Sequence, residues 1–201
     1  MEHQPKFSVI VPAFNSSAFI ENGLKSVYNQ SFKDYELIVV CDSCTDNTKE
    51  IAEKYGAITY EVNFHQDGQT RNVGLDHANG EWILFLDDDD HFLHEFVFEM
   101  LAANVGKHGE DILMFSSIWA RAGYARNTPD KILISVWNKC WKREAIGDTR
   151  FSNEKYISDL AFHEAMMKKE PKAIIWDQPF YYHDHMREGS QTDEQKKLGL
   201  I

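Results

Sequence analysis

The sequence predicts an α/β fold: one domain in which a central, mostly parallel sheet is flanked by helices. Three apolar runs rich in β-branched residues have the composition of strands buried on both faces. They are FSVIVPA (7–13), YELIVVC (35–41) and WILFL (82–86). Between them lie segments with apolar residues at helical spacing. This alternation is typical of a parallel sheet covered by helices on both sides.

The first half of the chain alternates regularly between strands and helices. Four helices are expected where apolar residues recur at helical spacing or a capping residue precedes them. They cover roughly residues 16–30, 45–55, 70–78 and 91–105. The run AITYEV (57–62) predicts one further strand, and Asn79-Gly80 marks the turn before the strand at 82–86.

The second half is less regular. Apolar runs predict four strands, at 111–119, 131–137, 173–176 and 179–183, and one helix is expected at 159–168. No linker, internal repeat or low-complexity tract interrupts the chain. We therefore expect a single domain over residues 1–201, with a first half of nucleotide-binding type.

Composition excludes several classes of protein. A chain of 201 residues with 43% apolar residues can bury a core and is not disordered. The net charge of −11 argues against binding along a nucleic-acid backbone, which needs a basic face. No apolar run reaches the roughly 18 residues of a membrane span, and the start lacks the pattern of a signal peptide. We therefore expect a cytoplasmic protein.

The three cysteines are Cys41, Cys44 and Cys140, too few for a disulfide framework. Cys41 and Cys44 form a C-x-x-C, but a zinc site needs a second ligand pair at matching spacing, and none follows. We interpret the pair as incidental, in preference to a metal or redox site.

Four consecutive aspartates, Asp87 to Asp90, follow the strand at 82–86. If the extended geometry continues, Asp87 and Asp89 share one side. Carboxylates that close repel one another, so they require a raised pKa or a cation. Mg²⁺ or Mn²⁺, with positions left for phosphate oxygens, resolves the conflict. Asp90 stands directly before an expected helix and is interpreted as its N-cap.

Three segments together resemble the family 2 glycosyltransferases of GT-A fold: SVIVPAFN, ELIVVCDSCTDNT and QTRNVGLDHANGEWILFLDDDD. That family pairs an SVI[IV]P-x-[YF]-N strand with a VVDDGSTDNT-like loop, an ARN-x-G segment and FLD-x-DD. The resemblance is dense over residues 7–90 and patchier at WNKCWKREAI (137–146), RFSNEKYISDLAF (150–162) and FYYHDHMREGSQT (180–192). It implies a metal-dependent, inverting transfer of a sugar from a nucleotide-sugar, most often a UDP-sugar, to an acceptor hydroxyl.

The resemblance also implies two halves and a set of acceptors. Residues 7–106 would bind the nucleotide, residues 107–192 would bind the acceptor, and residues 193–201 would form a tail. A saccharide or glycoconjugate is the expected acceptor, whereas the acidic charge disfavours a modified base in DNA.

For the nucleotide, the resemblance implies contacts from the loops that follow the first two strands. Pro12 and Phe14 would lie beside the uracil, Asp42 would accept a hydrogen bond from the base, and Arg71 would neutralise charge near the nucleotide. The loop departs from the family pattern, because cysteine and serine replace three of the four residues of DDGS. Only Asp42 keeps the family residue in CDSC.

For the acidic run, the resemblance implies that Asp87 or Asp88 holds the ribose. Asp89 would ligate the Mn²⁺ or Mg²⁺ that bridges the diphosphate. His185 lies where relatives have a histidine or arginine that meets the metal or the phosphate.

For catalysis, the resemblance places the base at Asp159, in SDLAF where the family reads EDxxF, although Asp159 could also only cap the helix that follows. Ser158 replaces the usual glutamate. Trp137, with Asn138 and Lys139, would shape the acceptor side, although Trp137 fits an ordinary core position equally well.

Two other classes compete with a glycosyltransferase. A phosphatase of dehalogenase type expects D-x-D-x-[TV], whereas DDDDHF ends in phenylalanine, and a nucleotidyltransferase expects a glycine-rich, basic loop where this chain has VPAFNSS. A non-catalytic nucleotide-binding relative is favoured by the altered CDSC loop. A carboxylate base at Asp159 argues against it, since a protein without catalysis has no need of one.

Overall fold

The computed structural model describes residues 3–119, 123–125, 133–154 and 157–184. Within these residues one mixed sheet has the strand order β3-β2-β1-β4-β8-β6-β9-β5, and β7 pairs with β6. The strands are β1 (Phe7–Ala13), β2 (Tyr35–Asp42), β3 (Ile58–Val62), β4 (Trp82–Phe85), β5 (His91–Phe92), β6 (Ile112–Trp119), β7 (Gly123–Ala125), β8 (Lys139–Lys142) and β9 (Ala173–His183).

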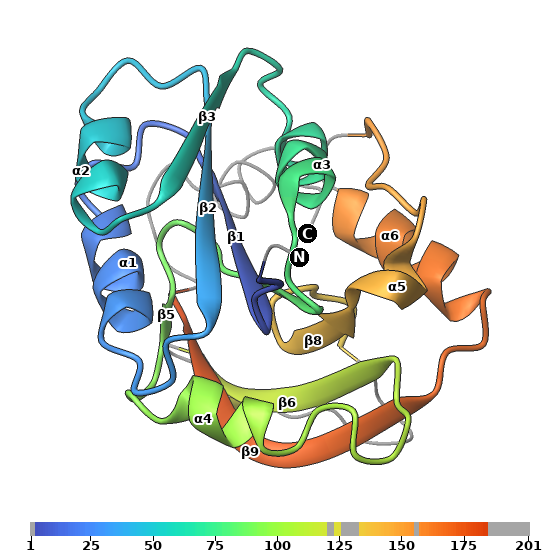
Figure 1. The fold of residues 1–201 in the computed structure, drawn as a ribbon. Coiled ribbons are helices and arrows are strands. Elements are labelled where there is room, and N and C mark those ends of the chain that lie inside the picture. The colour runs from blue at the N-terminus through green and yellow to red at the C-terminus, as the bar shows by residue number, and fades with distance from the viewer. Residues whose placement is uncertain (1–2, 120–122, 126–132, 155–156, 185–201) are drawn as a thin grey trace.

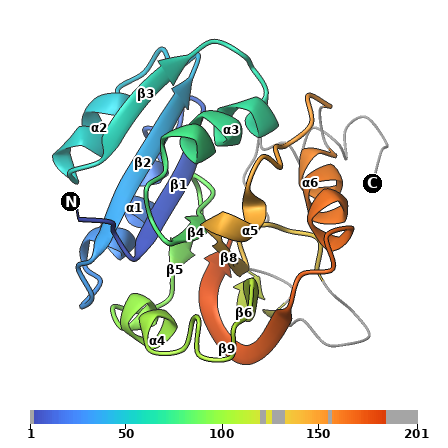
Figure 2. The same cartoon turned by 45° about the vertical axis from the view of Figure 1, so that its right-hand side comes forward.

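The four N-terminal strands are parallel to one another, with β1 between β2 and β4. β8 is antiparallel to both β4 and β6, and it joins this parallel part to the pair β6 and β9, which are parallel to each other. In Figure 1 the β6–β9 pair runs across the direction of β1 and β2, so the sheet curls strongly. The turned view in Figure 2 shows β9 bending around the lower end of the domain.

Helices cover both faces of the parallel strands. They are α1 (Ile20–Tyr28), α2 (Thr48–Lys54), α3 (Asp67–His77), α4 (Val97–Ala102), α5 (Arg143–Ile146) and α6 (Ser158–Met167). In Figure 1, α1 and α2 lie on one side of β1–β3 and α3 on the other. The predicted α/β fold, with a largely parallel sheet flanked by helices, is confirmed. No helix in the described part of the chain is long and apolar enough to cross a membrane.

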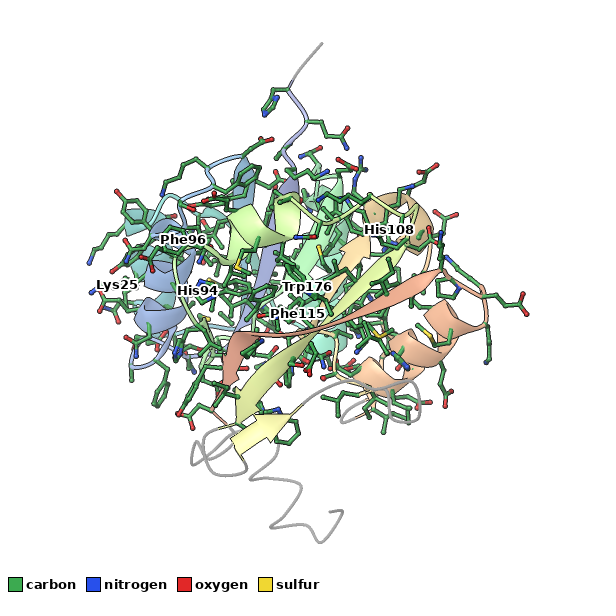
Figure 3. All side chains as sticks on the ribbon, turned by 90° about the horizontal axis from the view of Figure 1, so that it is seen from below. Lys25, His94, Phe96, His108, Phe115 and Trp176 are labelled. Carbon is green, nitrogen blue, oxygen red and sulfur yellow. The ribbon has the colours of Figure 1, made fainter. Side chains whose placement is uncertain are left out.

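Apolar side chains fill the space between the layers. All seven residues of β1 are buried, as the apolar composition of that run predicts. A second part of the core lies along β6 and β9, where Phe115 and Trp176 are register partners and both pack on Phe180. Figure 3 views this pair of strands from below, with the labelled Phe115 and Trp176 near the centre of the domain.

Several predicted elements differ from the structure. The helix expected over 91–105 begins only at Val97, because residues 91–92 pair with β9 as strand β5. Residues 133–137 of the strand predicted at 131–137 are irregular, and the strand β8 begins at Lys139. The two late strands are one strand, β9, because a register shift near Ser116 absorbs the polar residues between them.

Candidate active site

The carboxyl ends of β1, β2 and β4 meet at one edge of the sheet, because these strands are parallel neighbours. The residues that follow β1 contact the acidic run that follows β4. The backbone N–H of Phe14 donates to Asp88 Oδ2 at 3.3 Å, and the Ser16 hydroxyl donates to the same oxygen. The structure therefore brings together two segments that the resemblance assigns to one nucleotide.

Arg71 connects the acidic run to Asp159. Its side chain lies on α3 and is 4% exposed. The guanidinium Nη2 lies 2.6 Å from Asp87 Oδ1, and Nη1 lies 3.4 Å from Asp159 Oδ1. The Arg71 Nη1 also donates to Asp67, one helical turn earlier. Burial alone lowers the pKa of Arg71, but Asp159 and Asp87 raise it, and the net direction is upward. The guanidinium therefore stays charged and holds three carboxylates around it.

A glycine allows α3 to approach the start of α6 closely enough for this contact. A Cβ built at Gly68 would lie 2.7 Å from the Ser152 carbonyl oxygen and 2.9 Å from the Ser158 Cβ. Both distances are shorter than van der Waals contact, so a side chain here would push the two elements apart. Gly68 thus helps to set the reach of Arg71 toward Asp159.

Asp159 lies in the first turn of α6, with 29% of its side chain exposed. No side chain caps this helix, so Asp159 does not act as its cap. Its Oδ2 accepts a long hydrogen bond, 3.4 Å, from the Val136 N–H. Burial raises the pKa of the Asp159 carboxyl, the Arg71 charge lowers it and Asp87 raises it, with a net upward direction. A raised pKa brings a carboxylate closer to the range suited to a general base.

Asp42 is buried at the end of β2 and accepts five hydrogen bonds from the protein. Three come from the backbone N–H groups of residues 64–66, and two come from the hydroxyls of Ser43 and Thr70. Burial raises the pKa of Asp42, but the backbone donors, His65 first, lower it, and the net direction is downward. Since a carboxylate offers about four lone pairs, Asp42 mainly fixes the loop that leads into α3. Its contact with a base stays a prediction.

Asp90 is not the N-cap that the sequence indicated, because α4 begins seven residues later at Val97. The Asp90 side chain is fully buried, with Oδ2 2.9 Å from His183 Nδ1 and Oδ1 accepting from the Asp184 N–H at 2.8 Å. Burial lowers the pKa of His183, but the hydrogen bond to Asp90 raises it, and the net direction is upward. This pairing holds residues 91–92 on β9 and explains the late start of the helix.

Trp137 is 5% exposed and belongs to an aromatic column. Its ring stacks on Tyr181, with centroids 4.6 Å apart, and on His183 at 4.8 Å. The Tyr181 hydroxyl in turn accepts a hydrogen bond from the Asp87 N–H at 3.0 Å. Trp137 therefore packs in the core and also links the second half of the chain to the acidic run.

The other predicted residues differ in accessibility. Phe14 is 51% exposed and meets His65 edge to face at 6.0 Å, so its ring can contact a ligand. Pro12 is buried within β1. Asp89 is partly buried within the acidic run, and His185 lies outside the described residues.

Sequence reasoning missed two contributors to the site, Asp67 and Tyr181. Asp67 precedes Arg71 by four residues, a spacing that places the two side chains on one helix face. The sequence prediction began this helix at residue 70, so Asp67 was not recognised as part of it. Tyr181 carried no local signal, since its partner Asp87 is 94 residues away in sequence.

The C-x-x-C pair lies beside this edge of the sheet. Cys41 is buried, and Cys44 Sγ contacts the Asn15 N–H and the Ala13 carbonyl, both at 3.4 Å. Cys44 thus ties the loop after β2 to the end of β1. The interpretation of the pair as incidental stays a prediction.

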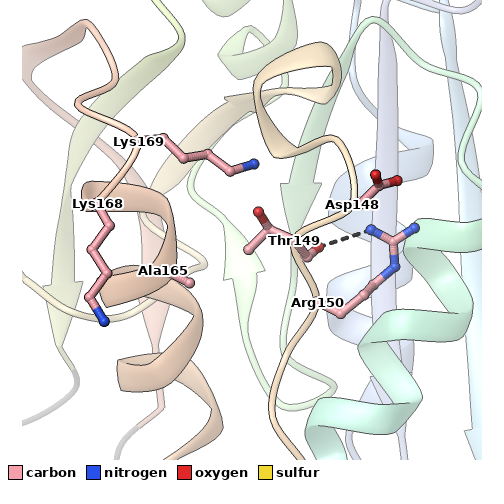
Figure 4. A pocket seen from close by; sticks show the side chains of 6 residues that line it. All are labelled: Asp148, Thr149, Arg150, Ala165, Lys168 and Lys169. Atoms are coloured by element: carbon pink, nitrogen blue, oxygen red, sulfur yellow. Dashed lines mark hydrogen bonds between the residues drawn. The ribbon is translucent and has the colours of Figure 1, made fainter.

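A shallow, open depression lies at the other end of α6 from Asp159 (Figure 4). It is lined by Asp148, Thr149, Arg150, Ala165, Lys168 and Lys169. Arg150 pairs there with Asp76 at 2.7 Å, and Lys169 donates to the carbonyls at the end of α5. A helix of ten residues is about 15 Å long, so α6 separates Lys168 and Lys169 in this depression from Asp159 by about that distance. We therefore place the candidate site at the acidic run and not here.

The chain is similar to known proteins. The profile of the family described as glycosyl transferase family 2 matches residues 8–172. A GalNAc(5)-diNAcBac-PP-undecaprenol beta-1,3-glucosyltransferase of Campylobacter jejuni is 44% identical over 96 residues, which are 44% of this chain and 31% of that protein. The match therefore covers less than a third of the relative's length.

Two solved structures share the fold. The structure of S. aureus TarS 1-349 in complex with UDP-GlcNAc matches with a TM-score of 0.79 and 27% identity, over 93% of this chain and 60% of that chain. Glucosyl-3-phosphoglycerate synthase from Mycobacterium tuberculosis, in complex with Mn²⁺, UDP and glucosyl-3-phosphoglycerate, matches with a TM-score of 0.69 and 17% identity, over 97% of this chain and 75% of that chain. The second likeness shows the fold alone.

Proposed function

This chain belongs to glycosyl transferase family 2, and we propose that it transfers a sugar from a UDP-sugar to an acceptor hydroxyl with inversion. One observation carries the proposal: Arg71 holds Asp87 of the acidic run and Asp159 of α6 around a single guanidinium. These residues lie far apart in sequence, and sugar transfer needs donor-binding and acid–base groups at one place.

For the donor, the loops at the carboxyl ends of β1 and β4 offer suitable groups. The exposed ring of Phe14 would lie beside the uracil, next to Pro12, and Asp87 or Asp88 would hold the ribose. The UDP-GlcNAc in the S. aureus relative supports a UDP-sugar as the donor class. Residues 7–106 would then form the nucleotide-binding half and residues 107–192 the acceptor-binding half.

The acidic run fits a hard divalent cation. Carboxylate oxygens are the ligands that Mg²⁺ and Mn²⁺ prefer, and such ions commonly take one or two carboxylates together with phosphate oxygens. Asp89 would hold the ion, with His185 as a further ligand. The bound ion would supply Lewis-acid stabilisation of the leaving diphosphate. The Mn²⁺ in the M. tuberculosis structure supports this cofactor class.

Asp159 would remove the proton from the acceptor hydroxyl as that oxygen attacks the anomeric carbon. Its upward-shifted pKa, set by burial and limited by Arg71, suits this task. Attack in a single displacement, from the face opposite the diphosphate, inverts the anomeric centre. A saccharide or glycoconjugate is the acceptor class that the name of the Campylobacter jejuni relative supports.

The test is a panel of UDP-sugars with Mn²⁺, scored by acceptor-dependent UDP release and by NMR of the product anomer. We expect transfer with inverted configuration. Asp159→Asn should lower turnover by about 10²-fold with near-normal UDP affinity, whereas Asp89→Ala should lose Mn²⁺-dependent UDP binding. A wild-type protein that binds UDP with Mn²⁺ but transfers no sugar would instead identify a non-catalytic nucleotide-binding relative.

A further inference from the structure

Lys139 is a fully buried lysine at the start of β8. Its Nζ donates to three oxygens: the carbonyls of Leu133 and Ser135, both at 2.5 Å, and Asn138 Oδ1 at 2.8 Å. All three acceptors belong to the irregular segment that leads into β8. The ammonium therefore ties this segment, residues 133–138, into a closed loop.

The tied segment reaches the proposed base. Val136 lies in its middle, and the N–H of Val136 donates to Asp159 Oδ2. The carbonyl of the same residue accepts from Trp141 Nε1 at 3.1 Å, so both sides of this peptide stretch are held. No regular secondary structure fixes residues 133–138. The position of the Val136 N–H therefore depends on side-chain contacts of this segment, among them the three hydrogen bonds of Lys139 and the stacking of Trp137 on Tyr181 and His183.

A buried ammonium is costly, and an apolar side chain at the same position would often be as stable or more stable. Within the described part of the chain, the hydrogen-bond acceptors of Lys139 are two carbonyls and one amide oxygen, and none is a carboxylate. Burial lowers its pKa to about 7, and Asp159 raises it. Lys139 adds this free-energy cost to the core and at the same time holds residues 133–138 beside Asp159. Such a residue is suited to positioning the carboxylate.

We propose that Lys139 is a positioning residue for Asp159, which it serves by holding residues 133–138 so that the Val136 N–H fixes the carboxylate toward the acceptor. The inference rests on the proposed function, because it concerns the base of that reaction. The charged groups that face Asp159 are Arg71 from α3, Asp87 after β4 and Lys139 from β8. Lys139 in turn faces Asp159 and His163, both on α6.

Lys139→Met tests the inference, with Lys142→Met as the matched control. Lys142 lies on the same strand but is partly exposed and pairs with Glu144 at 3.1 Å. We expect kcat to fall about tenfold or more in Lys139→Met, the scale of a displaced catalytic group. The Mn²⁺-dependent affinity for UDP and the melting temperature should not fall. The control should leave kcat, affinity and melting temperature unchanged.

Two further readouts need no turnover. In Lys139→Met the Val136 amide should exchange faster with solvent. The acid midpoint of the Asp159 carboxyl, followed by ¹³C NMR and assigned with Asp159→Asn, should move up, because the positive charge of Lys139 lowers it in the wild type. The acid limb of the kcat profile should move with it.

The outcomes separate the two proposals. If the wild type transfers no sugar, the proposed function fails, and the exchange and titration measurements still decide the role of Lys139. An active Lys139→Met protein with wild-type kcat, Val136 exchange and Asp159 midpoint would overturn the inference. Equal losses in kcat and UDP affinity would also overturn it, since a general structural defect affects both.

Discussion

Arg71 and Lys139 approach Asp159 from the two halves of the chain, and they are held in opposite ways. Arg71 comes from α3 and is surrounded by the carboxylates of Asp67, Asp87 and Asp159. Lys139 comes from β8, and its acceptors among the described residues are neutral oxygens of the segment before β8. Both side chains are almost completely buried.

From this difference we infer that Arg71 balances the charge of the carboxylates, whereas Lys139 fixes the path of the backbone before β8. Without Arg71, three carboxylates would face one another, partly removed from water, so its main contribution is electrostatic. Without Lys139, two carbonyls and one amide oxygen lose a donor, but no uncompensated charge is left behind. We therefore expect stability to depend strongly on Arg71 and only weakly on Lys139, whereas catalysis depends on both.

The largest effect should come from Arg71→Met. Removal of one partner from a buried ion pair costs about 3–5 kcal/mol, because the remaining charges stay uncompensated. We expect a loss of this size in the free energy of unfolding, measured by urea denaturation at pH 7. Arg150→Met is the control, since the Arg150–Asp76 pair is 34% and 54% exposed and should contribute less than about 1 kcal/mol. Equal losses in both variants would remove the contrast between the two buried cations.

The next effect is a pH dependence caused by Lys139. Burial lowers its pKa to about 7 in the folded protein from 10.5, so between these values the unfolded chain binds more protons than the folded one. Stability must then rise with pH in this window. We expect the free energy of unfolding of the wild type to gain on the order of 2 kcal/mol over Lys139→Met between pH 7 and pH 9. Parallel curves for the two proteins would show that the lysine titrates normally.

Gly68→Ala should move the Arg71 side and leave the Lys139 side in place. The new Cβ would collide with the Ser152 carbonyl, so α3 and the segment before α6 must separate. Such overpacking costs about 1 kcal/mol or somewhat more. The 3.4 Å contact between Arg71 and Asp159 should lengthen, so turnover should fall more than donor affinity. A variant with unchanged turnover would show that Asp159 does not depend on this approach.

The two regions also differ in what their sequence reveals. β1 agrees with its predicted bounds, and the predicted β2 and β4 each differ by one residue at the carboxyl end, because continuous apolar runs buried on both faces leave a strong local signal. The motifs also led to Asp87 and Asp159 as members of one site, and the structure places both against Arg71. For these strands and residues, local pattern and family resemblance agree.

Elsewhere, the contacts that decide the structure are distant in sequence or hidden in polar residues. Asp90 looks like a helix cap until His183, 93 residues away, binds its carboxylate. KCWK has the composition of a surface segment, yet its first three residues are buried in β8. Lys139 donates to the carbonyls of Leu133 and Ser135 in the irregular residues 133–138. No local periodicity encodes such partners.

The smallest effect should come from Asp67→Asn, which removes one carboxylate from Arg71 and leaves the other two. Asp67 lies one helical turn before Arg71 and is 24% exposed, and pairs of this kind contribute only about 0.5 kcal/mol. Because the guanidinium is surrounded by three carboxylates, removal of one also relieves their mutual repulsion. We expect the free energy of unfolding to change by no more than about 0.5 kcal/mol in urea denaturation, with normal turnover. A loss as large as that of Arg71→Met would mean that Arg71 mainly secures its own helix. In that case Arg71 would hold α3 and not Asp159, and only Lys139 would act on the proposed base.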